Sequence, residues 1–286
     1  MTALKWVAGA LFVVVMLGVC IKVYGAYAWN GATRVLYSRL ESARRPMSPR
    51  VFDAKEIESL PAPVQRYFRA ALTDGQAMVA AVELEHAGTF NMGEANDQWK
   101  PFTSRQQVVT NRPGFVWNGR IAMFPGVPVF VHDAYVAEEG ILRPSVLGVF
   151  LLADMHGTKD MAEGELMRFF AETAWYPTAL LPSQGVNWEA LDDHSARAVL
   201  VDGATRAVMT FRFGDDDLID TVHASARGRT VAGRIEMTAW QGRFWNYQKR
   251  DGMMIPLNGE VSWLLPQGPK PYWRGLMISL AYEFAK

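Results

Sequence analysis

The chain has 286 residues, of which 50% are hydrophobic, and its formal net charge is zero. Lys5 and Lys22 are the only charged residues among the first 28, so the remainder carries 27 basic and 29 acidic side chains. This balance excludes a typical nucleic-acid-binding protein, which needs a basic surface. The only cysteine, Cys20, lies in the apolar N-terminal segment, so the rest of the chain has no disulfide and no cysteine metal site.

The chain opens with an uninterrupted apolar stretch, 6–21, which continues after Lys22. If Lys22 extends its ammonium group to the interface, the stretch reaches the roughly 20 residues that span a bilayer. We therefore expect residues 1–29 to form one transmembrane helix in contact with membrane lipid. The alternative is a signal peptide that is cleaved at Ala26-Tyr27-Ala28.

Residues 30–60 are expected to form a juxtamembrane helix and a linker, because Pro46 and Pro49 interrupt the helical pattern. The arginine-rich sequence after the apolar stretch favours a cytoplasmic location for this side, whereas Lys5 and the free amine favour the opposite. We expect a single-pass protein of the inner (cytoplasmic) membrane with an extracytoplasmic domain, and a cytoplasmic domain is the alternative.

Residues 61–286 are expected to form a single β-rich soluble domain that opens with a short amphipathic helix at 64–72. From residue 78, apolar and polar residues alternate with the period of half-buried strands, and turn sequences separate the runs. A helical pattern covers 159–175. The expected strands are 102–110, 114–123, 127–137, 141–152, 188–191, 196–202, 206–213, 218–226, 233–247, 253–265 and 272–284.

Strands spaced about ten residues apart are typical of a sandwich, a barrel or a strongly curved sheet. Because one helix interrupts the series of strands, we predict an α+β fold that is mainly antiparallel β. The expected architecture is a curved sheet or half-barrel meander wrapped on that helix.

The sequence contains no recognisable catalytic motif, so we assign no catalytic residue, no metal ligand and no cofactor. His132 and Asp133 are adjacent, but they lie in a strand-like run, where neighbours point to opposite faces. Glu163 and Glu165 are placed near the start of the expected helix, where acidic residues complement the helix dipole. A hydrolase that uses these residues is the least favoured hypothesis.

Aromatic residues are the most informative feature of the soluble part, which contains eight of the ten tryptophans. They either fill the core of the curved sheet or line an apolar cavity for an acyl chain or a similar ligand. Arginines near them would meet an anionic headgroup. The candidate ligand-binding residues are Trp117, Arg120, Trp175, Trp240, Arg243, Trp245, Trp263, Trp273 and Arg274.

Several segments together resemble a bacterial family of uncharacterised, membrane-anchored proteins. The most specific of them are PTALLP at 177–182 and WLLPQGPKPYWRG at 263–275. The others are LPAPVQRYFRAAL, PGFVWNGRI, VHDAYV, AEGELMRFFAETAWYPTALLP and KRDGMMIPLNGEV. The resemblance runs from about Leu60 to Tyr282 and implies a membrane anchor but no activity. More loosely, the order of elements is similar to that of the lipoprotein-localisation carriers, whose curved sheet encloses a helix and an apolar cavity.

These observations favour a membrane-tethered domain that binds a lipid, an acyl chain or another hydrophobic ligand. The alternative is a structural or partner-binding module of the cell envelope whose aromatic residues simply form a core. Its protein partners are not identified by any sequence feature.

Overall fold

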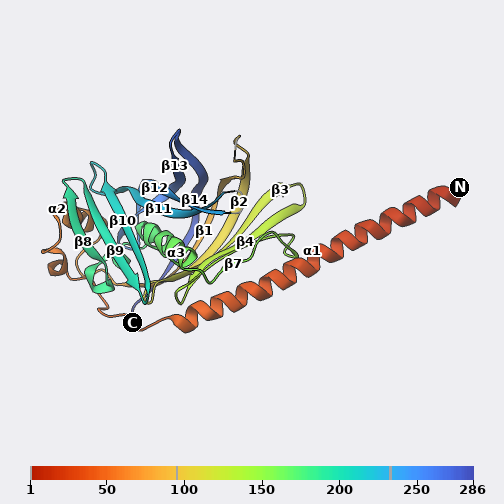
Figure 1. Ribbon diagram of the computed structural model, residues 1–286. Coiled ribbons are helices and arrows are strands. Elements are labelled where there is room, and N and C mark those ends of the chain that lie inside the picture. The colour runs from red at the N-terminus through yellow and green to blue at the C-terminus, as the bar shows by residue number, and fades with distance from the viewer. Residues whose placement is uncertain (1, 95, 232–233) are drawn as a thin grey trace.

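The computed structural model describes residues 2–94, 96–231 and 234–286. A long helix, α1 (Thr2–Ala43), projects from a domain in which one large sheet curves around helix α3 (Lys159–Glu172) (Figure 1). The expected α+β fold with a curved antiparallel sheet is confirmed. The remaining elements are α2 (Ala62–Ala71), β1 (Val79–Asn91), β2 (Trp99–Val109), β3 (Gly114–Phe124), β4 (Val127–Val136), β5 (Glu139–Val146), β6 (Phe150–Leu151), β7 (Met155–His156), β8 (Asn187–Asp192), β9 (Ser195–Asp202), β10 (Thr205–Phe213), β11 (Ile219–Val231), β12 (Arg234–Arg250), β13 (Met253–Leu265) and β14 (Gly268–Phe284).

The sheet is an open antiparallel meander, joined at its centre by its first and last strands. Its order is β6-β5-β4-β3-β2-β1-β14-β13-β12-β11-β10-β9-β8, and β7 pairs with β5. β1 pairs with both β2 and β14, so the strands before and after α3 form one continuous surface. The strand expected at 141–152 is divided between β5 and β6. Gly233, where another strand was expected to begin, lies outside the described residues.

Strand alternation decides which side chains face the helix and which face outward. In β12, Trp240 and Phe244 are buried on the concave face, whereas Arg243 and Trp245 are exposed on the convex face. The pattern is therefore amphipathic along the central strands, as the sequence predicted. The concave face is the one that carries the core.

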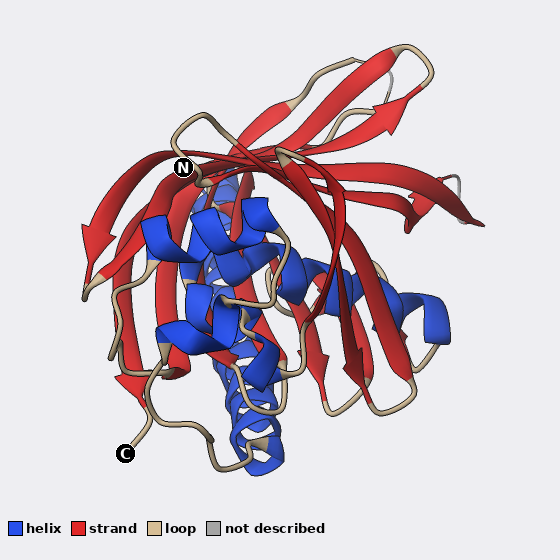
Figure 2. Cartoon of the chain, turned by 90° about the vertical axis from the view of Figure 1, so that its left-hand side faces the viewer, coloured by secondary structure: helices blue, strands red, loops and turns tan. Residues whose placement is uncertain are grey.

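Helical segments fill the concave side of the sheet (Figure 2). α3 continues into short 3-10 turns between Thr173 and Gln184, and α2 packs on β9 and β13. Phe169 and Phe170 of α3 and Tyr67 and Phe68 of α2 are almost completely buried in the same core. These four side chains join α2 and α3 in one aromatic core beneath the sheet.

Ion pairs connect distant turns at one end of the curled sheet. Arg112, in the β2–β3 turn, contacts Asp202 of β9 at 3.0 Å and Glu138 at 2.5 Å. The Tyr135 hydroxyl donates to the Asp202 carboxylate at 3.0 Å. These contacts join the β4 side of the sheet to the β9–β10 turn.

α1 continues as one helix through residue 29, the expected end of the anchor, to Ala43. A stripe of buried residues at helical spacing explains the continuity: Gly25, Trp29, Thr33, Leu36 and Leu40. Leu36 and Leu40 pack on β2–β5 from the convex side of the sheet, opposite α3. The expected juxtamembrane helix is therefore the second half of α1. One face of this half packs against the sheet and is shielded from solvent.

Candidate functional site

A cavity of about 400 Å³ lies between the concave face of the sheet and α3. Its volume is within the usual range for small-molecule sites, about 300–1,000 Å³. Most of its wall is apolar, and five of the nine expected ligand-binding residues lie in it. These five are Trp117, Trp175, Trp240, Trp263 and Trp273. Phe90, Ile121, Val131, Leu142, Phe244 and Tyr272 extend the apolar wall.

Three of these tryptophans share a local Trp-x-Gly pattern, in Trp117–Gly119, Trp240–Gly242 and Trp273–Gly275. Two residues along a strand point to the same face, so each indole has a glycine beside it. A Cβ on Gly275 would lie 2.2 Å from the Trp273 ring, and one on Gly119 would lie 2.0 Å from the Trp117 ring. Glycine therefore lets these two indoles lie close to the sheet, where they form the floor of the cavity.

The other four expected residues lie outside the cavity wall. Arg120 and Arg243 alternate with the inward residues, and their guanidinium groups lie over Phe130 and Trp245 respectively. Arg274 donates to Glu260 at 2.7 Å and lies over the Trp99 ring. Since their strands place these side chains on the convex face, they cannot meet a ligand headgroup inside the cavity.

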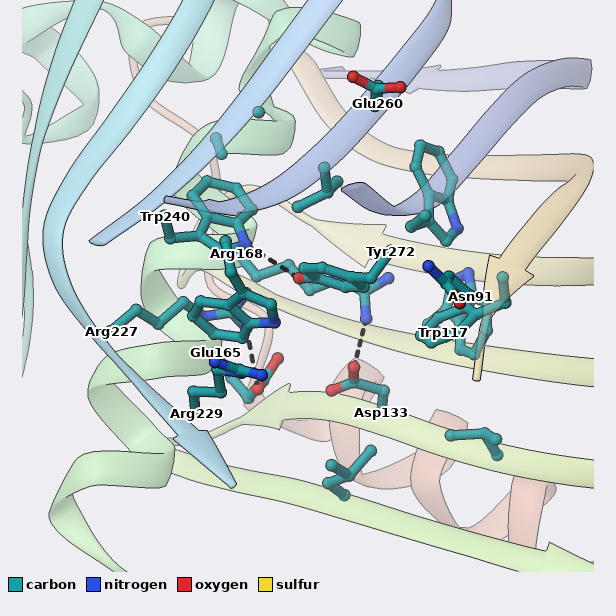
Figure 3. Close-up of a pocket in the computed structure, with 18 of the residues that line it drawn as sticks. Asn91, Trp117, Asp133, Glu165, Arg168, Arg227, Arg229, Trp240, Glu260 and Tyr272 are labelled. Atoms are coloured by element: carbon teal, nitrogen blue, oxygen red, sulfur yellow. Dashed lines mark hydrogen bonds and ion pairs between the residues drawn. The ribbon is translucent and has the colours of Figure 1, made fainter. Parts of the chain in front are cut away.

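The polar wall of the cavity centres on three charged residues of α3, Glu165, Arg168 and Glu172, spaced so that they share one helix face. Arg168 donates to Asp133 of β4 at 2.5 Å (Figure 3). It also donates to Glu172 at 2.8 Å. Glu172 also accepts from the Gln106 side chain at 2.6 Å. The Arg168 guanidinium lies over the rings of Phe115 and Trp117, so a fixed positive charge faces the aromatic wall.

A second arginine completes this cluster from the other side of the cavity. Arg227 of β11 donates to Glu165 at 3.2 Å and to the Gly164 carbonyl oxygen at 3.0 Å, and it lies over the Trp240 ring. Burial, and next the nearby Asp133 carboxylate, raise the pKa of Glu165 well above its usual range. With Glu165 protonated, two arginines balance Asp133 and Glu172, and the cluster is neutral.

Three polar atoms of the cavity wall have no hydrogen-bond partner within the described parts of the chain. They are the indole Nε1 of Trp175, Oδ1 of Asp133 and Oε2 of Glu165. Buried polar groups are usually paired, and an unpaired one costs about 1–3 kcal/mol. With Glu165 protonated, its free oxygen can donate to the neighbouring Asp133 carboxylate. The Trp175 N–H is then the atom left to bond a polar group that enters the cavity.

The β1–β2 hairpin reaches over one end of the cavity. Glu94 of this hairpin contacts Arg229 of β11 at 2.8 Å, and Lys270 of β14 lies 3.9 Å from the same carboxylate. All three residues line the cavity. Glu94 is largely exposed, so this ion pair is weak and can open at little cost.

The residues considered for a hydrolase do not form one site. Asp133 faces the cavity, but the His132 ring faces α1 and lies 2.8 Å from the Thr33 hydroxyl. Glu163 pairs with Lys159 on the surface of α3, whereas Glu165 lies inside the cluster. The expectation that His132 and Asp133 point to opposite faces is confirmed.

Sequence reasoning missed the buried ionic residues Arg168, Glu172 and Arg227. A signal was present in the α3 sequence, where Glu165, Arg168 and Glu172 recur on a face flanked by phenylalanines. Charged residues on the inward face of an apolar helix indicate paired burial. Arg227 carries no comparable local signal, because a bulge changes the register of β11 between Ala224 and Arg227.

Comparison with known proteins places the domain in a family. The model described as "Family of unknown function (DUF6920)" matches residues 58–282, so the chain belongs to this family. No curated protein shows significant sequence similarity to it. Among solved structures, LolA superfamily protein NE2245 from Nitrosomonas europaea has 10% sequence identity and a TM-score of 0.39, with 76% of this chain and 91% of that chain covered. This match agrees with the expected loose likeness to lipoprotein-localisation carriers, but it is too distant to indicate a ligand.

Proposed function

We propose that this protein is a membrane-tethered domain that binds a hydrophobic ligand, a lipid or another molecule with an acyl chain. The single observation that supports this most strongly is the cavity beside α3, whose wall contains five tryptophans. A core of the same composition would close around itself, because empty apolar volume costs stability. An apolar chain that fills this volume would recover the lost contacts.

The polar wall suggests that the ligand also carries a polar group. Trp175 offers an unpaired N–H donor to the cavity. A carbonyl oxygen of the ligand would accept from it. We infer that an amphiphile enters with its polar group toward α3 and its chain along the indoles.

The tether is the apolar first half of α1. The segment from Leu4 onward is long and apolar enough to cross a membrane, and its most apolar stretch is not buried by the domain. We propose that it is retained in the inner membrane and that the domain lies on the extracytoplasmic side. Reporter fusions to the exposed C-terminal residue Lys286 would test the side, since a periplasmic phosphatase is active only after export.

Native mass spectrometry of the full chain in a mild detergent tests the ligand proposal. The wild-type protein should retain a lipid or acyl adduct, and Val261→Trp, which fills the cavity, should lose most of it. Trp245→Ala is the matched control, because Trp245 lies on the convex face of the neighbouring strand. Lipid held only by α1 would appear equally in all three proteins and is thereby distinguished from the cavity ligand.

An adduct that survives Val261→Trp unchanged would contradict a ligand in the cavity. A mass without any adduct in every variant would favour the alternative, a structural or partner-binding module of the envelope. In that case crosslinking in membranes would be expected to capture a stable partner.

A further inference from the structure

Two neighbouring turns at one end of the sheet expose large apolar side chains to solvent. Phe124 ends β3 with 66% of its surface exposed, and Phe150, Leu151 and Leu152 follow β5 with 57%, 55% and 60%. The second group is held in place, because Phe150 and Leu151 pair with β5 and the Leu152 N–H donates to the Pro144 carbonyl oxygen. These four residues form one apolar patch on ordered backbone. Such a patch indicates an interaction surface, whereas single exposed apolar residues do not.

α1 leaves the domain between these two turns. A Cβ on Gly126, in the β3–β4 turn, would lie 2.9 Å from the Lys22 ammonium group. A Cβ on Gly148, just before β6, would lie 2.6 Å from the Gly25 carbonyl oxygen. The helix therefore passes in contact with both turns, and Figure 1 shows it continuing beyond this end of the sheet.

The position of Lys22 fixes the depth of the turns relative to a bilayer. The 18 residues from Leu4 to Ile21 span about 27 Å as a helix, close to the roughly 30 Å of the hydrocarbon core. Lys22 would then lie at the headgroup level, and Lys100, which lies near the Phe124 ring, would lie close to that level. The exposed apolar residues lie where the acyl region begins.

We propose that Phe124 and Phe150–Leu152 insert into the interfacial layer of the same bilayer that holds α1. This rim, as we call these four residues, is a second membrane contact made by the domain itself. Its apolar side chains gain burial among lipid, and the neighbouring Lys22 and Lys100 suit anionic headgroups. The proposal rests on the tether proposed above but not on a ligand in the cavity.

Single-cysteine labelling of the full chain in lipid nanodiscs tests the rim. In a Cys20→Ser background, an environment-sensitive fluorophore is placed at Leu151→Cys or Phe124→Cys. Val201→Cys is the matched control, since Val201 is 53% exposed on β9, toward the opposite edge of the sheet. Phe12→Cys, within the apolar part of α1, reports whether the tether itself is in lipid. The nanodiscs contain nitroxide lipids, and iodide serves as the aqueous quencher.

Labels at 124 and 151 should be quenched several-fold more strongly by nitroxide lipid than the label at 201, and less by iodide. If the label at 12 is quenched by lipid but those at 124 and 151 behave like 201, the rim proposal is wrong and the tether stands. If the label at 12 also shows no lipid quenching, the tether fails as well. Protection of 124 and 151 from both quenchers would mean a protein interface and would equally overturn a lipid contact.

Discussion

Trp29 of α1 stacks on His132 of β4, with ring centroids 3.8 Å apart and ring planes 11° apart. The Trp29 indole N–H also donates to Asn118 at 2.9 Å, and the Thr33 hydroxyl lies 2.8 Å from the His132 ring. His132 thus contacts two residues of the helix from the convex face of the sheet. Burial, and next the positive charge of Arg143, lower the pKa of His132 to about 4.

This pKa predicts that acid weakens the fold. In the unfolded chain the imidazole gains a proton near pH 6.5, whereas in the folded protein it does so only near pH 4. Stability is therefore present in full above pH 6.5 and falls as the pH drops toward 4. His86, whose burial lowers its pKa to about 3, acts in the same direction.

His132→Gln should flatten this acid dependence, because glutamine does not titrate. Each buried histidine contributes up to about 1.4 kcal/mol per pH unit within its window. Chemical unfolding of the full chain at pH 7, 5.5 and 4.5 measures the slope for both proteins. An unchanged slope in the variant would show that His132 is not the group that titrates.

Trp240 and Trp245 provide a matched pair for stability. Trp240 is 3% exposed and donates to the Tyr272 hydroxyl at 2.9 Å, so Trp240→Ala should cost about 3–5 kcal/mol. Trp245 is 39% exposed on the convex face, so Trp245→Ala should cost less than about 1 kcal/mol. Denaturant titration would reveal the difference, and equal losses would contradict the strand orientation of β12.

The Trp-x-Gly pairs predict an unusual sensitivity to a single methyl group. Gly275→Ala would place its Cβ 2.2 Å from the Trp273 ring, so the indole must tilt into the cavity. We expect a loss of about 1–3 kcal/mol and weaker ligand retention. Gly242→Ala is the control, because its Cβ meets the Trp240 ring at 3.4 Å, an ordinary contact. Similar losses in both variants would refute the role of close approach.

Glu165→Gln tests the protonation of the buried cluster. Because burial and Asp133 raise the pKa of Glu165, its contribution to stability is complete below the unfolded pKa, near 4.5, and is lost as the pH rises through the folded value. Glutamine keeps an oxygen that can accept from Arg227 but cannot ionise. The variant should exceed the wild type in melting temperature at alkaline pH, with a gap that shrinks toward pH 4.5. A gap independent of pH would contradict a raised pKa.

The sequence predicted the strands well because most of them have one buried face. The expected range 253–265 matches β13, and 196–202 differs from β9 by one residue. Four of the five cavity tryptophans were identified for the same reason, since aromatic residues alternate with polar ones along β3, β12, β13 and β14; Trp175 lies instead in the 3-10 turn after α3. Periodicity could not separate the two faces of a strand when both carry aromatic residues, and so Trp245 was grouped with Trp240.

Contacts between segments far apart in the sequence could not be predicted from local sequence patterns. The β1–β14 ladder joins residues such as Leu84 and Leu280, and neither strand carries a signal for the other. The same holds for Arg168 and Asp133, which meet only because β4 curves against α3. The stripe of α1 from Gly25 to Leu40 was hidden by the apolar character of the preceding residues, which masks where contact with the sheet begins.

The unbroken course of α1 through Lys22 and Gly25 has a mechanical consequence. A flexible linker would let the domain rotate freely relative to the apolar half of the helix. A helix held between two turns instead fixes the orientation of the proposed membrane span relative to the sheet. The cavity would then keep a constant distance from the proposed membrane and a constant orientation to it. Transfer of a ligand would then require the donor or acceptor molecule to come to the cavity.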